Sequence, residues 1–280
     1  MKDPDYLIIG KDVSKNARSP FLWNRVFEKL GSPHRMGTLD LELTGAEDFQ
    51  RFIQANPYLR GLAVGYPNKF CVESFLYPHK AFSLGVNVVR LQDGNAEGEN
   101  FDGVGAFGSL LSHWERKEDF SLINYKFYIF GTGSTARSFQ RILIAEGIKH
   151  ELVEFISSRD FTHDKIQGSN TLHQKNVKSN KATPSILVNA TPLGSKLFPN
   201  LAPFDHNLLD NLGNTVRLVF DFNYGVSDSG PYIFARKNQI EYLDGLSMNL
   251  IQAAHSFDFA TFSNHRLGIT QILEIMKESN

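Results

Sequence analysis

Short apolar runs and longer stretches with helical spacing follow one another along most of the chain. Runs typical of short buried strands lie at 6–9, 62–64, 86–91, 127–130, 152–156, 186–188 and 218–220. Helical spacing is found at 19–30, 102–114, 139–145 and 248–262. Because strands that alternate with helices form mostly parallel sheets, this pattern predicts an α/β protein.

The first of these helices has clear signals at both ends. Ser19 is a favoured N-cap residue, Pro20 suits the first helical position, and Gly31 is a favoured terminator. The helical spacing predicts an apolar face made of Phe21, Leu22, Val26, Phe27 and Leu30.

A glycine-rich turn joins the apolar run 127–130 to the next helix. Its residues are Gly131, Thr132, Gly133, Ser134, Thr135 and Ala136. Such a turn lets backbone N–H groups and a helix N-terminus approach a pyrophosphate. The third glycine of the usual dinucleotide fingerprint is absent, so Ala136 or Ser134 must do the close packing. A plain strand-to-helix turn is the other interpretation. Because the turn lies near mid-chain, we expect a different, substrate-holding unit to precede it.

Composition narrows the class of protein. The 280 residues suit two domains, and 41% of them are hydrophobic, which is enough for ordinary cores. The net charge of −1 gives no sign of nucleic acid or of an anionic membrane as a partner. The single cysteine, Cys71, allows no intrachain disulfide and has no metal-ligand spacing, so we expect a cytoplasmic protein without a metal. No secretory signal or membrane span is expected either.

Five segments, in order, resemble the motifs of the shikimate dehydrogenase family. They are 18–20 (Arg-Ser-Pro); 63–69 (Ala-Val-Gly-Tyr-Pro-Asn-Lys); 86–87 with 100–103 (Val-Asn and Asn-Phe-Asp-Gly); the glycine turn with 189–194 (Asn-Ala-Thr-Pro-Leu-Gly); and 221–224 with 245–248 and 252–253. The resemblance implies an N-terminal α/β substrate domain, a Rossmann-like NAD(P) domain and a C-terminal helical return to the first. We assign 1–104 with 246–280 to the substrate-binding domain and 105–245 to the NAD(P)-binding domain.

The resemblance also implies a catalytic pair. Hydride transfer to a ketone needs a proton donor and positive charge beside the developing alkoxide. In the family a lysine and an aspartate supply these, and they match Lys69 and Asp102. Lys69 follows a predicted strand, at the end where α/β proteins place their sites. Taken alone, each residue is more typical of a solvated surface charge, which is the commonest state of lysine and aspartate.

Further roles follow from the resemblance. The substrate would be bound by Ser19, Asn87, Tyr224 and Gln252, with Ser19 at a helix N-terminus that favours a carboxylate. The cofactor would be bound by Gly131, Gly133, Ser134, Thr135, Ala136, Ser158, Arg159, Asp160, Asn189, Thr191, Gly245 and Met248. Arg159 fits the 2′-phosphate of NADP, whereas Asp160 fits the ribose hydroxyl of NAD. We favour NADP and leave NAD open.

The chain departs from the family at the substrate motifs. Ala17, Ala63, Gly65 and Phe101 stand where the family has serine, asparagine, threonine and threonine. Each lost neutral hydrogen bond costs about 0.5–1.5 kcal/mol. Ser14, Asn16 or Arg18 are candidates to compensate.

The sequence therefore predicts a shikimate dehydrogenase of the aromatic amino acid (chorismate) pathway, a monomer or homodimer. The alternatives are a quinate-like or other cyclic polyol-acid dehydrogenase and a catalytically silent nucleotide-binding homologue.

Overall fold

A computed structural model describes residues 3–80, 83–114, 121–157, 171–173, 183–261 and 266–278. The chain divides into two compact units. Unit 1 comprises Met1–Gly105 and Asn249–Asn280, and unit 2 comprises Ala106–Met248. The assignment of one unit to the substrate and the other to NAD(P) stays a prediction, as do the domain bounds given above.

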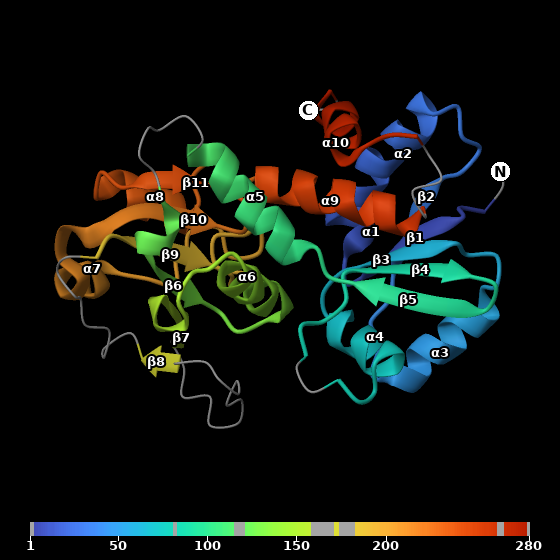
Figure 1. Cartoon of the computed structure of the whole chain (residues 1–280), viewed down its shortest axis with the longest axis horizontal. Coiled ribbons are helices and arrows are strands. Elements are labelled where there is room, and N and C mark those ends of the chain that lie inside the picture. Colours follow the sequence, from blue (N-terminus) through green and yellow to red (C-terminus); the bar gives the residue numbers. More distant parts are fainter. Residues whose placement is uncertain are drawn as a thin grey trace. The chain divides into compact units, whose positions relative to one another are not determined.

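Unit 1 is built on a five-stranded sheet of order β2-β1-β3-β4-β5 (Figure 1). The strands are β1 (Tyr6–Gly10), β2 (Met36–Asp40), β3 (Gly61–Val64), β4 (Val88–Gln92) and β5 (Asn95–Glu99). β1 pairs in parallel with β2 and β3, whereas β3–β4 and β4–β5 are antiparallel. The single strand expected at 86–91 is thus the first arm of a hairpin.

Helices cover both faces of this sheet. On one face lie α2 (Ser19–Lys29), α9 (Leu246–Ala260) and α10 (Ile269–Lys277), and on the other α3 (Ala46–Ala55) and α4 (Lys69–Leu76). Successive strand side chains point to opposite faces, so Ile8 and Ala63 join the α2/α9 core while Ile9 and Leu62 join the α3/α4 core. Ala63 of β3 therefore faces helices α2 and α9.

Helix α2 differs from its prediction in two respects. Its N-cap is Arg18, and Ser19 is the first helical residue. Its buried face consists of Leu22, Trp23, Val26 and Phe27. Phe21 is 56% exposed and Leu30 37% exposed, so the prediction that both belong to the apolar face is wrong. Phe21 points away from the buried stripe, and Leu30 is the C-cap residue beyond the last helical turn.

Unit 2 contains a six-stranded, all-parallel sheet of order β11-β10-β9-β6-β7-β8. The strands are β6 (Lys126–Phe130), β7 (Val153–Ser157), β8 (Thr171–His173), β9 (Ser185–Asn189), β10 (Val216–Asp221) and β11 (Glu241–Leu243). The chain runs outward from β6 to β8, returns to β9 on the other side of β6, and runs outward again to β11. In such sheets ligands bind beyond the carboxyl ends of the strands at this reversal. The predicted α/β, Rossmann-like architecture is confirmed.

The helices of unit 2 also lie on both faces of their sheet. α5 (Asp102–Trp114), which begins in unit 1, and α6 (Ser134–Ala145) share one apolar core, and α7 (His206–Leu212) and α8 (Gly230–Lys237) share the other. The remaining short elements are α1 (Val13–Asn16) and 3₁₀ turns at Leu122–Asn124, His150–Leu152 and Gly213–Thr215. Within the described residues no helix has both the length and the apolar character needed to cross a membrane.

Candidate active site

Lys69 and Asp102 form a largely buried ion pair in unit 1. Lys69 is the first residue of α4 and Asp102 the first residue of α5. The Lys69 ammonium contacts Asp102 Oδ2, and the two side chains are only 18% and 8% exposed. Taking two charges out of water is costly unless they are paired and hydrogen-bonded. The interpretation of both residues as solvated surface charges is therefore wrong.

Asn68 fixes the entry to α4, a role that the sequence did not suggest. Its side chain is fully buried. Nδ2 donates to the Leu41 carbonyl at 2.7 Å, and Oδ1 accepts from the Leu43 N–H at 2.8 Å. The residue before Lys69 is thus fastened to the segment that follows β2.

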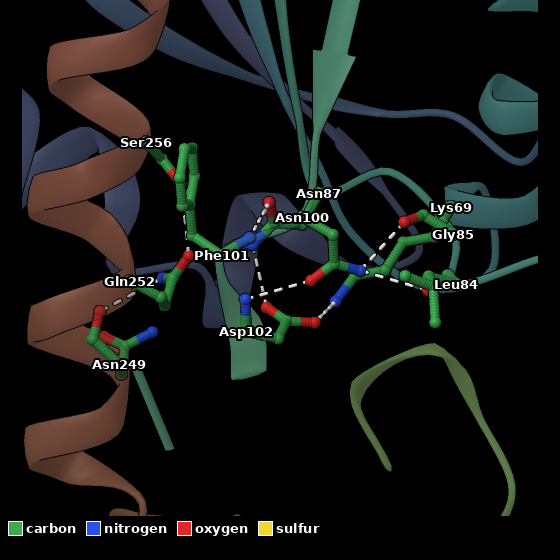
Figure 2. A network of polar contacts seen from close by, with 10 residues as sticks. All are labelled: Lys69, Leu84, Gly85, Asn87, Asn100, Phe101, Asp102, Asn249, Gln252 and Ser256. Atoms are coloured by element: carbon green, nitrogen blue, oxygen red, sulfur yellow. Dashed lines mark hydrogen bonds and ion pairs between the residues drawn. The ribbon is translucent and has the colours of Figure 1, made fainter. Parts of the chain in front are cut away.

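Asn87 and Gln252 join the pair to form the Lys69 cluster, which comprises Lys69, Asn87, Asp102 and Gln252 (Figure 2). Asn87 Nδ2 donates to Asp102 Oδ1 at 2.8 Å and to Gln252 Oε1 at 3.2 Å. Asn87 Oδ1 accepts from the Phe101 N–H at 3.0 Å. Gln252 comes from α9, far along the chain, so only the tertiary fold brings it here. Two amides beside a paired ammonium and carboxylate can bind hydroxyl groups of a polar substrate.

The other predicted substrate residues lie outside this cluster. Ser19 is 9% exposed in the first turn of α2. Tyr224 belongs to unit 2. It lines a cavity of about 270 Å³ together with Asp221, Asn223 and Tyr242. Their substrate roles stay predictions.

Ser14, Asn16 and Arg18, the candidates to replace the missing polar groups, have different surroundings in the structure. The Ser14 N–H donates to Asp40 Oδ1 at 2.9 Å, and the Ser14 hydroxyl donates to Asp40 Oδ2. A substrate carboxylate at Ser14 would therefore meet the Asp40 charge. Asn16 donates to the Asp12 carbonyl at 3.3 Å, on the surface. Arg18, the half-buried N-cap residue of α2, stays the candidate.

Phe101, where the family has threonine, packs against α9. Its ring stacks on His255 with centroids 5.5 Å apart and meets Phe259 edge-on at 5.9 Å. Burial lowers the pKa of His255, although nearby Asp258 opposes this. The neighbour of Asp102 is thus held by aromatic packing as well as by Asn87.

Two positions of the turn in unit 2 are occupied by glycine for different physical reasons. Gly131 has a φ of +100°, and a Cβ there would lie 2.8 Å from the Ala190 carbonyl oxygen. Gly133 is the N-cap of α6 with ordinary φ, and a Cβ there would meet nothing within 4 Å. Gly131 is thus required by the backbone, whereas Gly133 leaves open space at a helix N-terminus, which suits a pyrophosphate. Ala136 is buried in the core, as the close-packing interpretation expected, and Ser134 is buried and Thr135 half-buried in the first turn.

The segment 189–194 is shaped by its own polar side chains. Asn189 is fully buried; its Nδ2 donates to the Leu193 carbonyl at 2.6 Å, and its Oδ1 accepts from the Thr191 N–H at 3.0 Å and hydroxyl at 2.7 Å. Asn223 Nδ2 donates to the carbonyls of Thr191 and Leu193. The side chains of Asn189 and Thr191 thus hold the loop, and their role in binding a cofactor stays a prediction.

Asp221, at the end of β10, is the buried centre of this arrangement. Its Oδ1 accepts from Asn189 Nδ2 at 2.9 Å and from the Asn223 N–H at 3.0 Å, and its Oδ2 accepts from the Tyr242 hydroxyl at 3.3 Å. Burial raises the pKa of Asp221 to about 6 despite these bonds.

Gly245 and Met248 have packing roles in the structure. A Cβ on Gly245 would lie 2.1 Å from the Phe222 carbonyl oxygen, and the Gly245 N–H donates to the Asn223 carbonyl at 3.0 Å. Met248 is 6% exposed in the α5/α6 core. Ser158, Arg159 and Asp160 lie outside the described residues, so the choice between NADP and NAD that rests on them stays a prediction.

Known proteins resemble this chain over almost its whole length. No family model matches it. The shikimate dehydrogenase (NADP(+)) of Methanococcus maripaludis is 25% identical over 280 residues, covering 97% of this chain and 95% of that protein. The shikimate dehydrogenase (NADP(+)) of Streptococcus thermophilus is 28% identical over 277 residues, covering 93% and 92%. The resemblance that the five motifs indicated is confirmed.

Solved structures show the same fold. Shikimate dehydrogenase 1 from Peptoclostridium difficile superposes with a TM-score of 0.77 at 19% identity, covering 98% of this chain and 96% of that one. Shikimate 5-dehydrogenase from Listeria monocytogenes, in complex with shikimate and NAD, gives 0.71 at 21% identity, covering 98% and 96%. Quinate dehydrogenase from Corynebacterium glutamicum, in complex with NAD, gives 0.73 at 19% identity, covering 99% and 100%.

Proposed function

We propose that this protein is an NADP-dependent shikimate dehydrogenase that interconverts shikimate and 3-dehydroshikimate in the formation of chorismate and the aromatic amino acids. The observation that carries the proposal is the buried Lys69–Asp102 pair, hydrogen-bonded through Asn87 to Gln252. The near full-length resemblance to shikimate dehydrogenases supports the substrate and the cofactor.

The Lys69 cluster supplies the groups that this reaction needs. In the oxidation, the substrate carbon loses a hydride and its hydroxyl loses a proton. Lys69, once its amine is neutral, takes this proton. In the reverse direction the Lys69 ammonium stabilises the developing alkoxide and donates a proton to it, and Asp102 orients Lys69. The amides of Asn87 and Gln252 bind neighbouring ring hydroxyls. When bound, NADP⁺ would supply the hydride acceptor.

The glycine turn of unit 2 fits the cofactor. The open space at Gly133 and the N-terminus of the twelve-residue helix α6 would receive the pyrophosphate. Arg159 would hold the 2′-phosphate of NADP, because a guanidinium pairs well with phosphate oxygens. In Arg159→Ala we expect the KM for NADP to rise much more than the KM for NAD.

A quinate-like dehydrogenase is the second candidate. The observation that favours it is the apolar character of positions that are polar in the family. Ala63 is part of the α2/α9 core, and Ala17 and Phe101 pack against it. A third possibility is a silent nucleotide-binding homologue, against which the intact Lys69 cluster argues. A cytoplasmic location fits each of these functions, since Cys71 allows no intrachain disulfide. Each function is also compatible with a monomer or a homodimer.

A spectrophotometric screen of shikimate and quinate with NADP and NAD tests the proposal. We expect the highest kcat/KM for shikimate with NADP, and a fall in kcat of at least about 10²-fold in Lys69→Ala, the scale of a lost general acid or base. Lys29→Ala, which removes an exposed lysine at the end of α2 in the same unit, is the matched control and should keep the wild-type kcat. Turnover of quinate alone would establish the second candidate, and NADP binding without turnover the third.

A further inference from the structure

Glu73 is a buried carboxylate that the proposed chemistry does not use. It lies one helical turn after Lys69 on α4, so both side chains project from the same face of that helix. Glu73 is only 3% exposed. A buried charge at this position needs an explanation, because carboxylates are seldom buried unless they are well paired.

Both oxygens of Glu73 bind the turn that leads to β4. Oε1 accepts from Lys80 Nζ at 2.9 Å and from the Leu84 N–H at 3.1 Å. Oε2 accepts from the Ser83 hydroxyl and from the Gly85 N–H at 2.8 Å. Burial opposes ionisation, but the bonds from Ser83, Lys80 and the two backbone N–H groups bring the pKa of Glu73 below its ordinary value. An ionised Glu73 therefore holds two consecutive peptide groups in place.

Asn100 binds the carbonyl oxygens of the same two residues. Its Nδ2 donates to the Leu84 carbonyl at 3.1 Å and to the Gly85 carbonyl at 2.8 Å (Figure 2). Its Oδ1 accepts from the Asp102 N–H at 3.0 Å. Asn100 thus links the 84–85 turn to Asp102, the first residue of α5, by hydrogen bonds.

The bonds close a ring around the catalytic pair. The ring runs from Lys69 along α4 to Glu73, through Leu84 and Gly85 to Asn100, on to Asp102, and back to Lys69 by the ion pair. A further bond, from the Val86 N–H to the Lys69 carbonyl at 2.9 Å, ties the turn to the start of α4.

We propose that Glu73 is a positioning residue for the Lys69–Asp102 pair and acts through the 84–85 turn and Asn100. This inference rests on the proposed function of that pair. Catalysis needs the two charged groups held in a narrow range of positions, and a displacement of about 1 Å costs roughly 10²-fold in rate. Glu73 is suited to the task because each of its two oxygens accepts from a backbone N–H group, which can only donate.

Glutamine cannot reproduce this arrangement. Its side chain has the same shape, but one oxygen becomes an NH₂ group that donates. The NH₂ group would face the N–H of either Leu84 or Gly85, so one backbone bond is lost in either orientation. We expect kcat to fall by about 10-fold to 10²-fold in Glu73→Gln, with the KM for NADP changed less than about twofold.

A double-mutant cycle tests whether Glu73 acts through Asn100. If it does, Glu73→Gln combined with Asn100→Ala should be no slower than Asn100→Ala alone, because the path is already broken. Multiplied losses in the double variant would overturn the proposal. Glu97→Gln, which breaks an exposed ion pair with Arg90 in the same unit, is the matched control and should keep the wild-type kcat.

Hydrogen exchange gives a readout that needs no turnover. In Glu73→Gln we expect faster amide exchange at 84–87 and also at 100–105, whereas Glu97→Gln should leave both unchanged. Unchanged exchange at 100–105 in a folded Glu73→Gln protein would overturn the proposal. A wild-type protein without dehydrogenase activity would refute the proposed function, while the exchange pattern would still decide whether Glu73 positions Asp102.

Discussion

Single residues make this chain less polar than the shikimate dehydrogenase motifs at three positions of unit 1. Ala17, Ala63 and Phe101 stand at family positions that carry hydroxyl or amide groups, and all three contact the α2/α9 core. The Lys69 cluster beside them keeps its hydrogen bonds. On the function proposed above, the chain would therefore retain the groups for proton transfer while offering fewer groups to bind a polar ring. Substrate affinity, rather than the chemical step, is where we expect this protein to differ.

Ala17→Ser should restore one of the lost contacts. We expect the KM for shikimate to fall by about 2-fold to 10-fold, the effect of one neutral hydrogen bond, with kcat unchanged because the contact serves ground and transition states alike. Ala46→Ser, at the start of α3, is the control. An increase in KM in Ala17→Ser would show that the pocket has been rebuilt around alanine.

Gly65→Thr would restore another hydroxyl group of the family motif, but it would also disturb the packing around position 65. The φ of Gly65 lies outside the positive region, so the backbone itself accepts other residues. However, a Cβ there would lie 3.3 Å from the Ile9 carbonyl oxygen and 3.4 Å from Val13 Cγ1. A threonine must displace one of them, so its effect on KM would combine a new hydroxyl with a shifted strand end.

Asp221 should make stability depend on pH. Its pKa is raised from 3.8 to about 6 in the folded protein, so between these values the folded state binds more protons than the unfolded state. Stability should therefore fall as the pH rises through that window, by on the order of 3 kcal/mol in total. Asp221→Asn resembles the protonated form, since the Tyr242 hydroxyl can turn to accept from its NH₂ group.

Thermal midpoints of the wild type and of Asp221→Asn, measured from pH 4 to pH 8, test this expectation. The variant should gain stability relative to the wild type as the pH rises, and most of the gain should be complete above about pH 7. Parallel pH curves for the two proteins would contradict a raised pKa at Asp221.

At the scale of elements, burial decides which strands can be recognised from their residues. The strands expected from apolar runs correspond to β1, β3, β4, β6, β7, β9 and β10. The strands that were not expected are β2, β5, β8 and β11, and these are the edge strands of the two sheets. An edge strand has a neighbour on one side only and needs no continuous apolar run, as the residues Asn-Ala-Glu-Gly-Glu of β5 illustrate. Their pairing is set by the strands beside them.

The β6–α6 turn yields a matched pair of glycine substitutions. Gly133→Ala should fold normally, because the new methyl group meets open space, but it should raise the KM for NADP at least about tenfold by occupying room near the pyrophosphate. Gly131→Ala should instead destabilise the fold by about 1–3 kcal/mol, because alanine disfavours a positive φ and would press on Ala190. Thermal unfolding and cofactor kinetics separate the two effects. Wild-type KM for NADP in Gly133→Ala would argue against the pyrophosphate site.

For the molecule as a whole, two helices carry the chain between the units. α5 begins in unit 1 with Asp102 and continues into unit 2, and α9 begins in unit 2 and continues into unit 1, where it carries Gln252. The N-terminal and C-terminal parts of unit 1 are thus separated in sequence by all of unit 2.

The sequence by itself determined the α/β class, the interior strands and the glycine turn, because each of these is encoded by neighbouring residues. Its resemblance to the shikimate dehydrogenase motifs added Lys69 and Asp102 as candidates. Only the tertiary structure decided which residues are neighbours in space. It joined Gln252 to Asn87, buried Glu73 under the 84–85 turn, tied Ser14 to Asp40, and gave Gly131 and Gly133 different reasons for lacking a side chain. The physical reason is that a hydrogen bond or an ion pair depends on the distance between atoms in space, which the packing of the strands and helices sets, and not on separation along the chain.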